Sequence, residues 1–419
     1  MRAVPCLEDN TPRTAAVSGF ARAAVQERTR WSAKLGQRTR DRTVVSADCR
    51  GACTCVTRHS VDQTALVADA ALVRVCPAGR LQLAGQAWLP RGVNSYPLLQ
   101  HAAAGRSDAI LDIFAQASAL DRPLLRMSAF LDRGEGPGRT RDTHGNPLEA
   151  GLCALDSVLA LAADSGMRLI LILANYWADF GGVPALLHML APGDRLPKEA
   201  FFTDDRAIAA QLAYQDALVS RINHVNGRCY AHDPTILAWE LMNEARSQRW
   251  LARYRGAPRM LARWARRMSD GLRAAGARQL IAWGGAGHLG EHGEDMRALA
   301  AEGGVDILTL HMYGNRVRAT WGKRRADAAI AWGERHLRSR SRIARAAGLP
   351  LLLEEVNWKA ASRADDERAR VLGAWLEIAR SLDVGTLPWM IGEAGRPDYD
   401  GYLIRPEDHA TRSVLRRCG

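Results

Sequence analysis

The sequence predicts a (β/α)8 barrel, an α/β fold in which eight parallel strands alternate with helices. Eight short apolar segments follow one another along residues 88–392, and segments with helical periodicity lie between them. The apolar segments are nearly continuous, which is typical of strands covered on both faces of a parallel sheet. Eight repeats in one region favour a closed barrel. An open doubly wound sheet is the alternative.

The first 72 residues differ from the rest of the chain. They are rich in Arg, Thr and Ser and show weak hydrophobic periodicity, which predicts an N-terminal extension that is poorly ordered or partly helical. Residues 73–419 are expected to form the barrel domain. This domain should open with a hairpin, whose strands at 73–75 and 81–83 flank a turn at Pro77-Ala78-Gly79. We expect the hairpin to cap the bottom of the barrel.

The remaining elements are expected in a regular order. Asp108 and Asp205 are suited to the first turns of helices, and Gly166 and Gly348 are suited to end them. The eight strands are expected within 88–96, 123–129, 168–176, 236–244, 279–285, 307–314, 349–358 and 386–392. Helices are expected at 107–120, 152–165, 205–225, 257–275, 326–347 and 365–382.

Composition excludes several classes of function. The net charge is +12, but no basic stripe interleaved with aromatic residues is present, so we do not expect a nucleic-acid partner. No apolar run reaches the roughly 18 residues of a membrane span. We expect no signal peptide in the first 30 residues, because charged residues interrupt them throughout. Either the protein is not exported by that route, or its true start lies downstream of Met1. The eight cysteines lack the spacing of a zinc site or a redox pair. We expect a monomer without a metal or cofactor.

Two short motifs are interpreted as loops. Residues 285–290 fit G-x-G-x-x-G, but the glycines that follow would break the helix that a dinucleotide site requires. Residues 288–292 fit H-x-x-E-H, a zinc-protease pattern that needs a helix to bring both histidines to one face. Gly287, Gly290 and Gly293 make a loop the better prediction.

Polar and aromatic residues mark the ends of the expected strands. Active sites of (β/α)8 barrels lie at the carboxyl ends of the strands. Taken singly, each residue could have a structural role in a salt bridge or in core packing. Together they predict one polar site at the mouth of the barrel. They are Asn94, Tyr96, Arg126, Asn175, Trp177, Asn243, Glu244, His311, Tyr313, Glu354, Glu355, Trp358 and Trp389.

Two carboxylates on opposite strands suit cleavage of a glycosidic bond. One must protonate the departing oxygen, and the other must attack the anomeric carbon or activate water. Glu244 ends the fourth strand, and Glu355 lies in the seventh. Tryptophan side chains fit such a site, because their flat faces pack against the C–H face of a sugar ring. Glu240 lies four residues before Glu244, and we expect it to be buried and paired with Arg126.

Several segments resemble glycoside hydrolase family five, and within it the endo-β-1,4-mannanase branch. The similarity extends over about residues 73–415 and includes every expected strand. The fourth-strand segment is the most specific, and the fifth strand is the least similar. The similar segments are RGVNSYPLL, LLRMSAFLDRG, RLILILANYWADFGG followed by FFTDD, YAHDPTILAWELMNEAR, LTLHMYG, PLLLEEVNW and DYDGYLIRP.

The resemblance implies a role for each matching residue. Glu244 would be the general acid/base and Glu355 the nucleophile, with the pKa of Glu244 raised. Asn243 would bind the sugar 2-hydroxyl, and Trp389 would stack under the cleaved sugar. The remaining roles are assigned by position. Arg126 and Tyr313 would support Glu355, His311 would hold the acid/base side, Asn94, Tyr96 and Trp177 would line neighbouring subsites, and Asn175 and Trp358 are further substrate-binding candidates.

The chain departs from the family's pattern in four places, one of which is the loop Gly284–Gly293 after the fifth strand. Ala245 replaces a proline after the acid/base, Val356-Asn357 replace an aromatic-Gly pair after the nucleophile, and Pro97 replaces a tryptophan. Both glutamates are present.

The resemblance therefore implies retaining hydrolysis of β-1,4-mannosidic bonds in mannan or glucomannan by an extracellular enzyme, without a membrane partner. Another β-glycanase, an exo-β-glycosidase and a non-catalytic carbohydrate-binding barrel are the alternatives.

Overall fold

The structure is a computed structural model that describes residues 71–133, 138–247, 256–314, 325–359 and 365–418. Apart from its last two residues, the expected N-terminal extension lies outside these ranges. Within them, no helix has the length and apolar character needed to cross a membrane.

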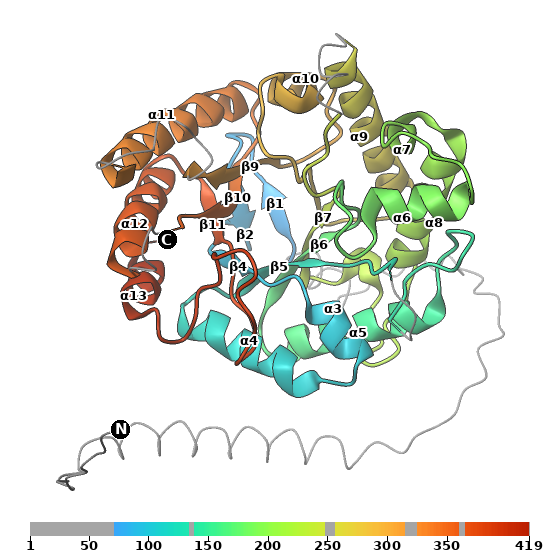
Figure 1. The fold of residues 1–419 in the computed structure, drawn as a ribbon, viewed down its shortest axis with the longest axis horizontal. Coiled ribbons are helices and arrows are strands. Elements are labelled where there is room, and N and C mark those ends of the chain that lie inside the picture. The colour runs from blue at the N-terminus through green and yellow to red at the C-terminus, as the bar shows by residue number, and fades with distance from the viewer. Residues whose placement is uncertain (1–70, 134–137, 248–255, 315–324, 360–364, 419) are drawn as a thin grey trace, which may run out of the picture. The chain divides into compact units, whose positions relative to one another are not determined.

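The strands form a closed parallel barrel, as predicted. One sheet has the order β4-β5-β6-β7-β8, and the other has the order β11-β10-β9. The bridges Arg91–Thr386 and Ala282–Ile307 join the two sheets at both edges. Figure 1 shows the strands inside a ring of helices. The barrel strands are β4 (Gly92–Asn94), β5 (Leu124–Ser128), β6 (Arg168–Ile172), β7 (Ile236–Glu240), β8 (Leu280–Ala282), β9 (Leu308–Tyr313), β10 (Leu351–Asn357) and β11 (Gly385–Pro388).

The six predicted helices are all present, and the loops hold further short helices that periodicity did not reveal. The predicted ones are α4 (Ser107–Ala119), α5 (Glu149–Asp164), α8 (Asp205–Val219), α9 (Ala257–Ala274), α11 (Arg325–Ala346) and α12 (Asp365–Ser381). The additional ones are α3 (Leu98–Ala103), α6 (Gly182–Leu190), α7 (Ala200–Thr203), α10 (Met296–Glu302) and α13 (His409–Arg417), with 3-10 turns η1 (Tyr230–His232) and η3 (Glu291–Gly293).

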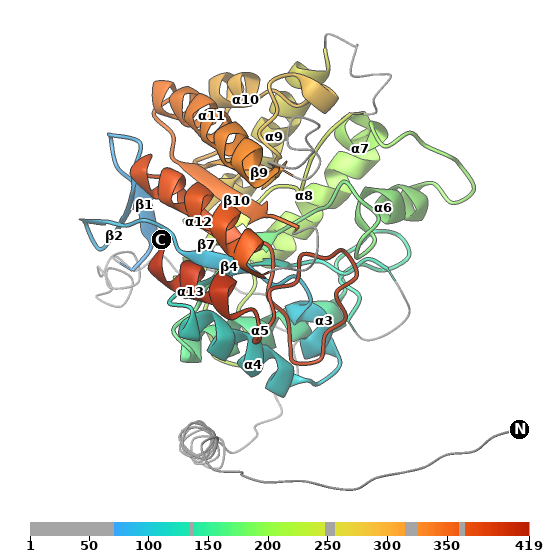
Figure 2. The same ribbon diagram turned by 60° about the vertical axis from the view of Figure 1, so that its left-hand side comes forward.

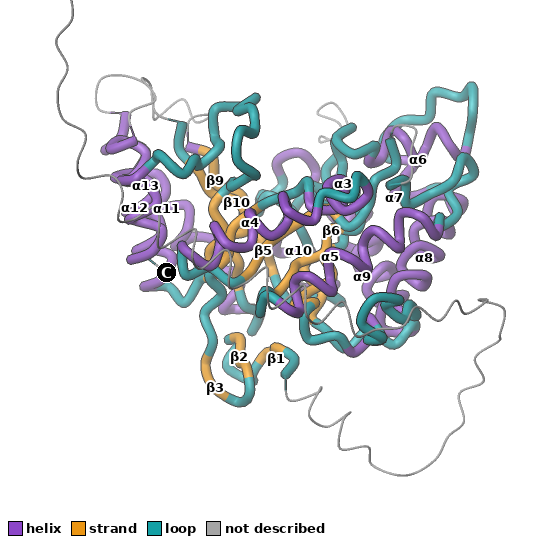
Figure 3. Tube along the Cα trace, turned by 90° about the horizontal axis from the view of Figure 1, so that it is seen from below, coloured by secondary structure: helices purple, strands orange, loops and turns teal. Residues whose placement is uncertain are grey.

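The hairpin closes the amino-terminal end of the barrel. Strand β1 (Val73–Val75) pairs antiparallel with β2 (Leu81–Leu83), and β2 pairs with β3 (Gln86–Ala87). Val73 and Leu81 pack in one buried cluster with inward-facing residues of the barrel strands. Figure 3 shows the hairpin below the strands, at one end of the barrel. The prediction that it caps the bottom is confirmed, and the other end remains for the site.

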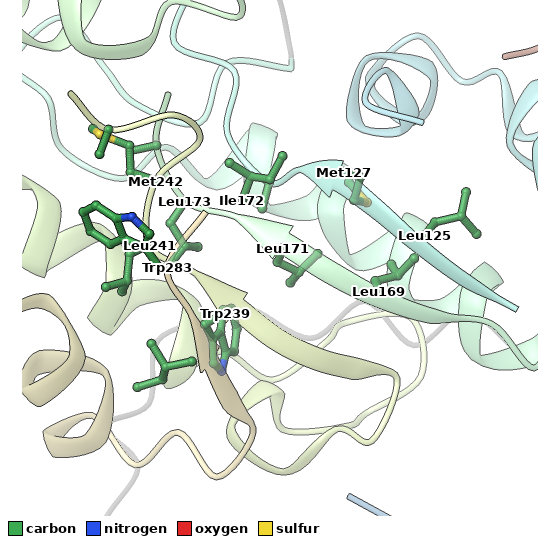
Figure 4. Packing of buried hydrophobic residues seen from close by; sticks show 14 of the residues in the cluster. Leu125, Met127, Leu169, Leu171, Ile172, Leu173, Trp239, Leu241, Met242 and Trp283 are labelled. Carbon is green, nitrogen blue, oxygen red and sulfur yellow. The ribbon is translucent and has the colours of Figure 1, made fainter. Parts of the chain in front are cut away.

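A larger apolar layer separates the strands from the helices. Leu125 and Met127 of β5 and Leu169 and Leu171 of β6 belong to this layer and are fully buried. Figure 4 shows these side chains projecting from neighbouring strands, with Trp239 of β7 beside them. Alternate residues of the same strands point into the barrel, because successive side chains of a strand face opposite sides. This alternation turns Arg126 inward.

The long segment between β11 and α13 folds back across the mouth of the barrel. The side chain of Gln116, in α4, donates a hydrogen bond to the carbonyl oxygen of Gly392 at 2.9 Å. The backbone amide of Ala394 donates to Asp112, also in α4, at 3.1 Å. Figure 2 shows this segment beside α3 and α4. This C-terminal segment therefore forms one wall of the mouth of the barrel.

Arg122 ties the first and last parts of the barrel together. Its side chain is fully buried, and burial lowers its pKa to about 9. The guanidinium donates to the carbonyl oxygens of Gly92 at 3.1 Å, Leu415 at 3.1 Å and Cys418 at 2.6 Å. It also reaches the hydroxyl of Thr386 at 3.2 Å. One cation therefore satisfies buried oxygens from β4, β11 and α13.

The variant Arg122→Met tests this link. Methionine fills part of the space but leaves several buried carbonyl oxygens without a donor, so we expect the free energy of unfolding to fall by about 3 kcal/mol or more. Urea denaturation measures the change. The control Arg259→Met removes an exposed arginine and should alter stability by less than about 0.5 kcal/mol. Equal effects of the two variants would contradict the proposed link.

Candidate active site

A cavity of about 880 Å³ lies at the carboxyl ends of the strands. It is on the side that the hairpin leaves open, as expected for this fold. Ten of the thirteen residues predicted for the mouth line it, and they come from seven strands or from the loops that follow them. They are Asn94, Tyr96, Arg126, Asn175, Trp177, Asn243, Glu244, Tyr313, Glu355 and Trp389.

Glu244 lies just past β7, in a left-handed backbone conformation with φ of 50°. Such a conformation is uncommon for a residue other than glycine and often marks a functional site. One carboxylate oxygen accepts hydrogen bonds from Trp177 Nε1 at 2.7 Å and from Arg246 at 2.9 Å. The other lies 3.1 Å from His311 Nδ1. The local turn thus aims the carboxylate at the cavity between three donors.

These donors decide the charge of Glu244. Burial alone would raise its pKa, but the hydrogen bond and charge of His311, the charge of Arg246 and the Trp177 hydrogen bond lower it below its usual value. The expectation of a raised pKa is therefore wrong for this structure. The physical reason is the positive charge on two neighbouring side chains, which sequence spacing did not reveal.

Glu355 faces Glu244 across the cavity. Its Oε1 accepts a hydrogen bond from Arg126 Nη1 at 2.6 Å, and its Oε2 accepts one from the Tyr313 hydroxyl at 2.6 Å. Oxygens of Glu244 and Glu355 lie within 4.8 Å of each other and of a His311 ring nitrogen. Two carboxylates from strands on opposite sides of the barrel therefore converge on one point.

Arg126 connects most of the polar groups beneath the cavity. Its side chain is completely buried. Nε and Nη2 each donate to Glu240 at 2.6 Å, which confirms the predicted pairing. Nη2 also donates to Asn243 Oδ1 at 2.7 Å, and Nη1 donates to Asn94 Oδ1 at 3.2 Å. Burial would lower the pKa of Arg126, but the surrounding glutamates raise it well above its usual value.

His311 lies behind the two facing glutamates, and it is not among the residues that line the cavity. Its side chain is 1% exposed. Burial would lower its pKa, but Glu355, Glu244 and Glu354 together raise it to about 10. The ring is therefore an imidazolium at neutral pH and supports the carboxylates from below.

Aromatic side chains form two walls. The Trp389 ring stacks on Tyr96, with centroids 5.5 Å apart and planes 22° apart. Phe180 meets Tyr96 edge-on at 5.1 Å. On the opposite side, Trp177 keeps 36% of its surface exposed. The cavity thus runs between aromatic rings, whose flat faces are suited to pack against the C–H faces of sugar rings. The peptide between Trp389 and Met390 is cis.

Trp358 does not reach the cavity, and its assignment to substrate binding is wrong. The side chain is 1% exposed. It packs edge-on against Trp375 of α12, with ring centroids 6.0 Å apart, and its Nε1 donates to Glu367 at 2.8 Å. Alternation along β10 explains the error, because Glu355 points inward and a residue three positions later faces the helices.

The departures from the family's pattern have local explanations. Asn357 donates hydrogen bonds to the carbonyl oxygens of Trp389 and Tyr402, and so ties β10 to the segment after β11. Ala245 is 1% exposed and belongs to the apolar layer. Pro97 precedes helix α3 and accepts a hydrogen bond from the amide of His101. All three replacements are accommodated without displacing Glu244 or Glu355 from the cavity.

Sequence reasoning missed the residues that loops bring to the rim. Arg246, directly after the fourth-strand motif, could have been found from its position beside Glu244. The segment after β11 carried a signal, because DYDGYLIRP follows the last strand and therefore begins at the mouth. The missed residues that line the cavity include Ser128, Phe130, Arg133, Asp179, Phe180, Arg396, Tyr399, Asp400 and Tyr402.

The predicted interpretation of residues 288–292 is confirmed. They form a turn rather than a regular helix, with His292 at φ of 54° inside η3.

Elsewhere, oxygen, nitrogen and sulfur atoms of Cys153, Asp156 and His224 lie close enough to hold an ion. Arg221 lies against this group, donating to Asp156 at 2.6 Å, so a protein cation already balances its charge.

Glu240→Ala tests the role of the buried pair. The change removes two hydrogen bonds from Arg126 and leaves that cation partly unpaired, so we expect a loss of about 3–5 kcal/mol in the free energy of unfolding. Chemical denaturation provides the measurement. Glu334→Ala is the matched control, because it breaks an exposed pair with Arg338 and should cost less than about 1 kcal/mol. A mild effect of Glu240→Ala would show that the pair contributes little.

Sequence comparison relates the chain to known proteins. A family model described as GH family 5 beta-mannosidase-like matches residues 135–370. Mannan endo-1,4-beta-mannosidase 3 of Oryza sativa subsp. japonica is 32% identical over 366 residues, covering 77% of this chain and 75% of that protein. Mannan endo-1,4-beta-mannosidase 1 of Solanum lycopersicum is 28% identical over 349 residues, covering 77% and 84%.

Solved structures share the fold. The endo-beta-1,4-mannanase from Thermotoga petrophila superimposes with a TM-score of 0.67 at 24% identity, covering 78% of this chain and 76% of that one. The endo-1,4-beta-mannanase from Rhizomucor miehei gives a TM-score of 0.69 at 20% identity, covering 82% and 98%. The fold, the family model and the sequence relatives lead to one conclusion: the chain belongs to glycoside hydrolase family 5 and is a glycoside hydrolase with a (β/α)8 barrel.

Proposed function

We propose that this glycoside hydrolase cleaves β-1,4-mannosidic bonds in mannan-type polysaccharides with retention of configuration. The observation that carries the proposal is the pair Glu244 and Glu355, which face each other with oxygens within 4.8 Å. Retaining enzymes hold their two carboxyl groups about 5–5.5 Å apart, and inverting enzymes leave about 6.5–9.5 Å for a water molecule. The separation therefore supports double displacement.

In the first step, Glu355 attacks the anomeric carbon while the glycosidic oxygen leaves. Arg126 and Tyr313 hold the Glu355 carboxylate with one hydrogen bond on each oxygen, which orients it for attack. Glu244 must give a proton to the leaving oxygen. Its Oε1 lies 3.1 Å from His311 Nδ1, so the proton is shared within this pair and reaches the leaving oxygen through Glu244.

In the second step, Glu244 removes a proton from water, and the water oxygen displaces Glu355 from the anomeric carbon. The product then carries a new hydroxyl group, and Glu355 recovers its negative charge. Formation of the glycosyl ester removes that charge from the site for the lifetime of the intermediate. Because a nearby negative charge raises the pKa of an acid, its loss favours the ionised Glu244 that this step requires.

The mannan assignment is supported by the sequence relatives, whose names give mannan endo-1,4-beta-mannosidase activity. The cavity supports a substrate of more than one sugar, because about 880 Å³ is at the upper end of the roughly 300–1,000 Å³ typical of small-molecule sites. In this proposal Trp389 stacks under the cleaved sugar and Trp177 lines a neighbouring subsite, since both side chains line the cavity. The other lining side chains offer hydroxyl, amide and carboxylate groups to sugar hydroxyls.

The stereochemistry of the product tests the mechanism. We expect the first product released from a β-1,4-manno-oligosaccharide to be the β-anomer, followed by slow mutarotation. Time-resolved proton NMR of the anomeric signals distinguishes the two forms. Release of the α-anomer as the first product would contradict the double-displacement mechanism.

Two substitutions separate the roles of the glutamates. Glu355→Ala should abolish turnover of mannan and of activated aryl β-mannosides alike, because no nucleophile remains. Glu244→Gln should slow mannan cleavage by about 10²–10⁴-fold but spare the first step on an aryl mannoside, whose leaving group needs no proton. Burst kinetics with the aryl substrate shows the accumulating intermediate. Full activity of Glu355→Ala would reassign the nucleophile.

An exo-acting β-glycosidase or another β-glycanase on the same barrel is the competing assignment. Digestion of mannan, glucomannan, cellulose and xylan, followed by sizing of the products, distinguishes them. Internal cleavage of mannan into mixed oligosaccharides is the expected outcome. Release of monosaccharide alone would favour exo action, and cleavage of cellulose or xylan without mannan would overturn the substrate.

A further inference from the structure

We propose that Glu354 is a positioning residue, whose buried carboxylate pairs with the Nε2 side of His311 and holds that ring doubly protonated against the two facing glutamates. The inference deepens the proposed function and rests on it, because it assigns how the site retains its proton. Glu354 does not line the cavity, so we infer that it acts on the site through His311 and not by touching the substrate.

An irregularity in β10 makes the contact possible. Leu353 pairs with Leu310 of β9, but Glu355 pairs with the next residue, His311, so one extra residue is inserted at Glu354. A bulge of this kind re-aims side chains that would otherwise alternate. As a result, Glu354 and Glu355 both reach the interior of the barrel, although they are adjacent in sequence.

Two polar groups without hydrogen bonds then face each other. Glu354 is fully buried, and neither of its carboxylate oxygens has a hydrogen-bond partner among the described residues. The same holds for His311 Nε2. Nε2 and Oε2 of Glu354 lie 3.6 Å apart, slightly beyond a good hydrogen bond. Buried charged groups persist in proteins when they are paired. The Oε2 atom of Glu354 faces His311 Nε2, while its Oε1 atom lies equally far, at 3.6 Å, from Arg126 Nε.

The second ring nitrogen fixes the protonation state. His311 Nδ1 lies 3.1 Å from Glu244 and 3.5 Å from Glu355. Both ring nitrogens therefore face carboxylate oxygens. A neutral imidazole has a donor on only one nitrogen and would direct a lone pair at a carboxylate with the other. Only the imidazolium offers a donor on both sides, and the raised pKa of His311 agrees with this geometry.

Other charged groups near the ring do not replace Glu354. Arg126 lies on the opposite side of Glu354, with Nε 3.6 Å from its Oε1, and its own charge opposes protonation of His311. Glu240 is engaged by Arg126 through both oxygens. Glu294 accepts hydrogen bonds from Trp283 Nε1 and the Gly287 amide. The hydroxyl of Tyr313 is directed at Glu355. Glu354 is thus the carboxylate placed at Nε2.

Glu354→Gln removes the charge and keeps the shape. We expect the pKa of His311 to fall by about 1–3 units in this variant, the shift typical of losing one close opposite charge. Titration of ¹⁵N-histidine-labelled protein by NMR, with the signal assigned from His311→Asn, reports the protonation of both nitrogens. Glu294→Gln is the matched control, because it neutralises a buried glutamate that does not touch the ring nitrogens, and it should shift His311 by less.

The pH profile shows whether the pair serves catalysis. Lowering the pKa of His311 means that the ring loses its proton at a lower pH, so the alkaline limb of kcat/KM for mannan should move to lower pH by a similar amount in Glu354→Gln. A uniform loss of activity, with an unmoved alkaline limb, would reduce Glu354 to a structural residue and overturn the proposal.

The wild-type protein provides a test that does not depend on folding of the variant. His311 should remain protonated on both nitrogens well above pH 7. A ring that titrates near its ordinary pKa, or a single protonated nitrogen at neutral pH, would overturn the proposal. If the protein cleaves no mannan while His311 behaves as expected, the proposed substrate fails and the buried pair stands.

Discussion

The site depends on one buried cation among carboxylates. Arg126 is fully enclosed, and a guanidinium in such a place is tolerated only when its donors are satisfied and its charge is compensated. Its partners Asn94, Glu240, Asn243 and Glu355 come from β4, β7, the β7 loop and β10. Each strand must therefore bring its polar group to the same height in the barrel as the guanidinium.

The charge balance around this arginine links stability to chemistry. Glu240 takes the bidentate contact and has no access to substrate, whereas Glu355 shares the same guanidinium and faces the cavity. One cation thus has one partner enclosed in the barrel and one partner at the cavity. His311 has the corresponding position on the other side, between Glu244 and Glu355 on one nitrogen and Glu354 on the other. The two cations together hold four glutamates in a small volume.

Irregular backbone positions the glutamates of the site more than regular strands do. Glu244 has a left-handed backbone conformation, and the bulge in β10 turns two consecutive glutamates inward. The segment after β11 carries Trp389 and reaches back to Asn357. Through that contact, the Asn that stands in place of the family's Gly holds the backbone of Trp389 at the cavity. The replacement adds a side-chain tie between two segments of the rim.

The sequence alone determined the barrel, the hairpin and the convergence of ten polar or aromatic residues. The reason is that long apolar strands and helical periodicity are local properties, and parallel strands bring their carboxyl ends to one edge. The sequence also predicted the pairing of Glu240 with Arg126, because the alternation of side chains along each strand turns both residues toward the inside of the barrel.

Only the tertiary structure decided the charge on Glu244, the burial of Trp358, and the loop residues Phe180, Arg396 and Tyr399 at the rim. These depend on contacts between segments distant in sequence and on a bulge that interrupts the period of two. A pattern that assumes regular strands places Glu354 and Glu355 on opposite faces. Packing places Glu354 and Glu355 both inside the barrel, where each carboxylate lies beside the positive charges of Arg126 and His311.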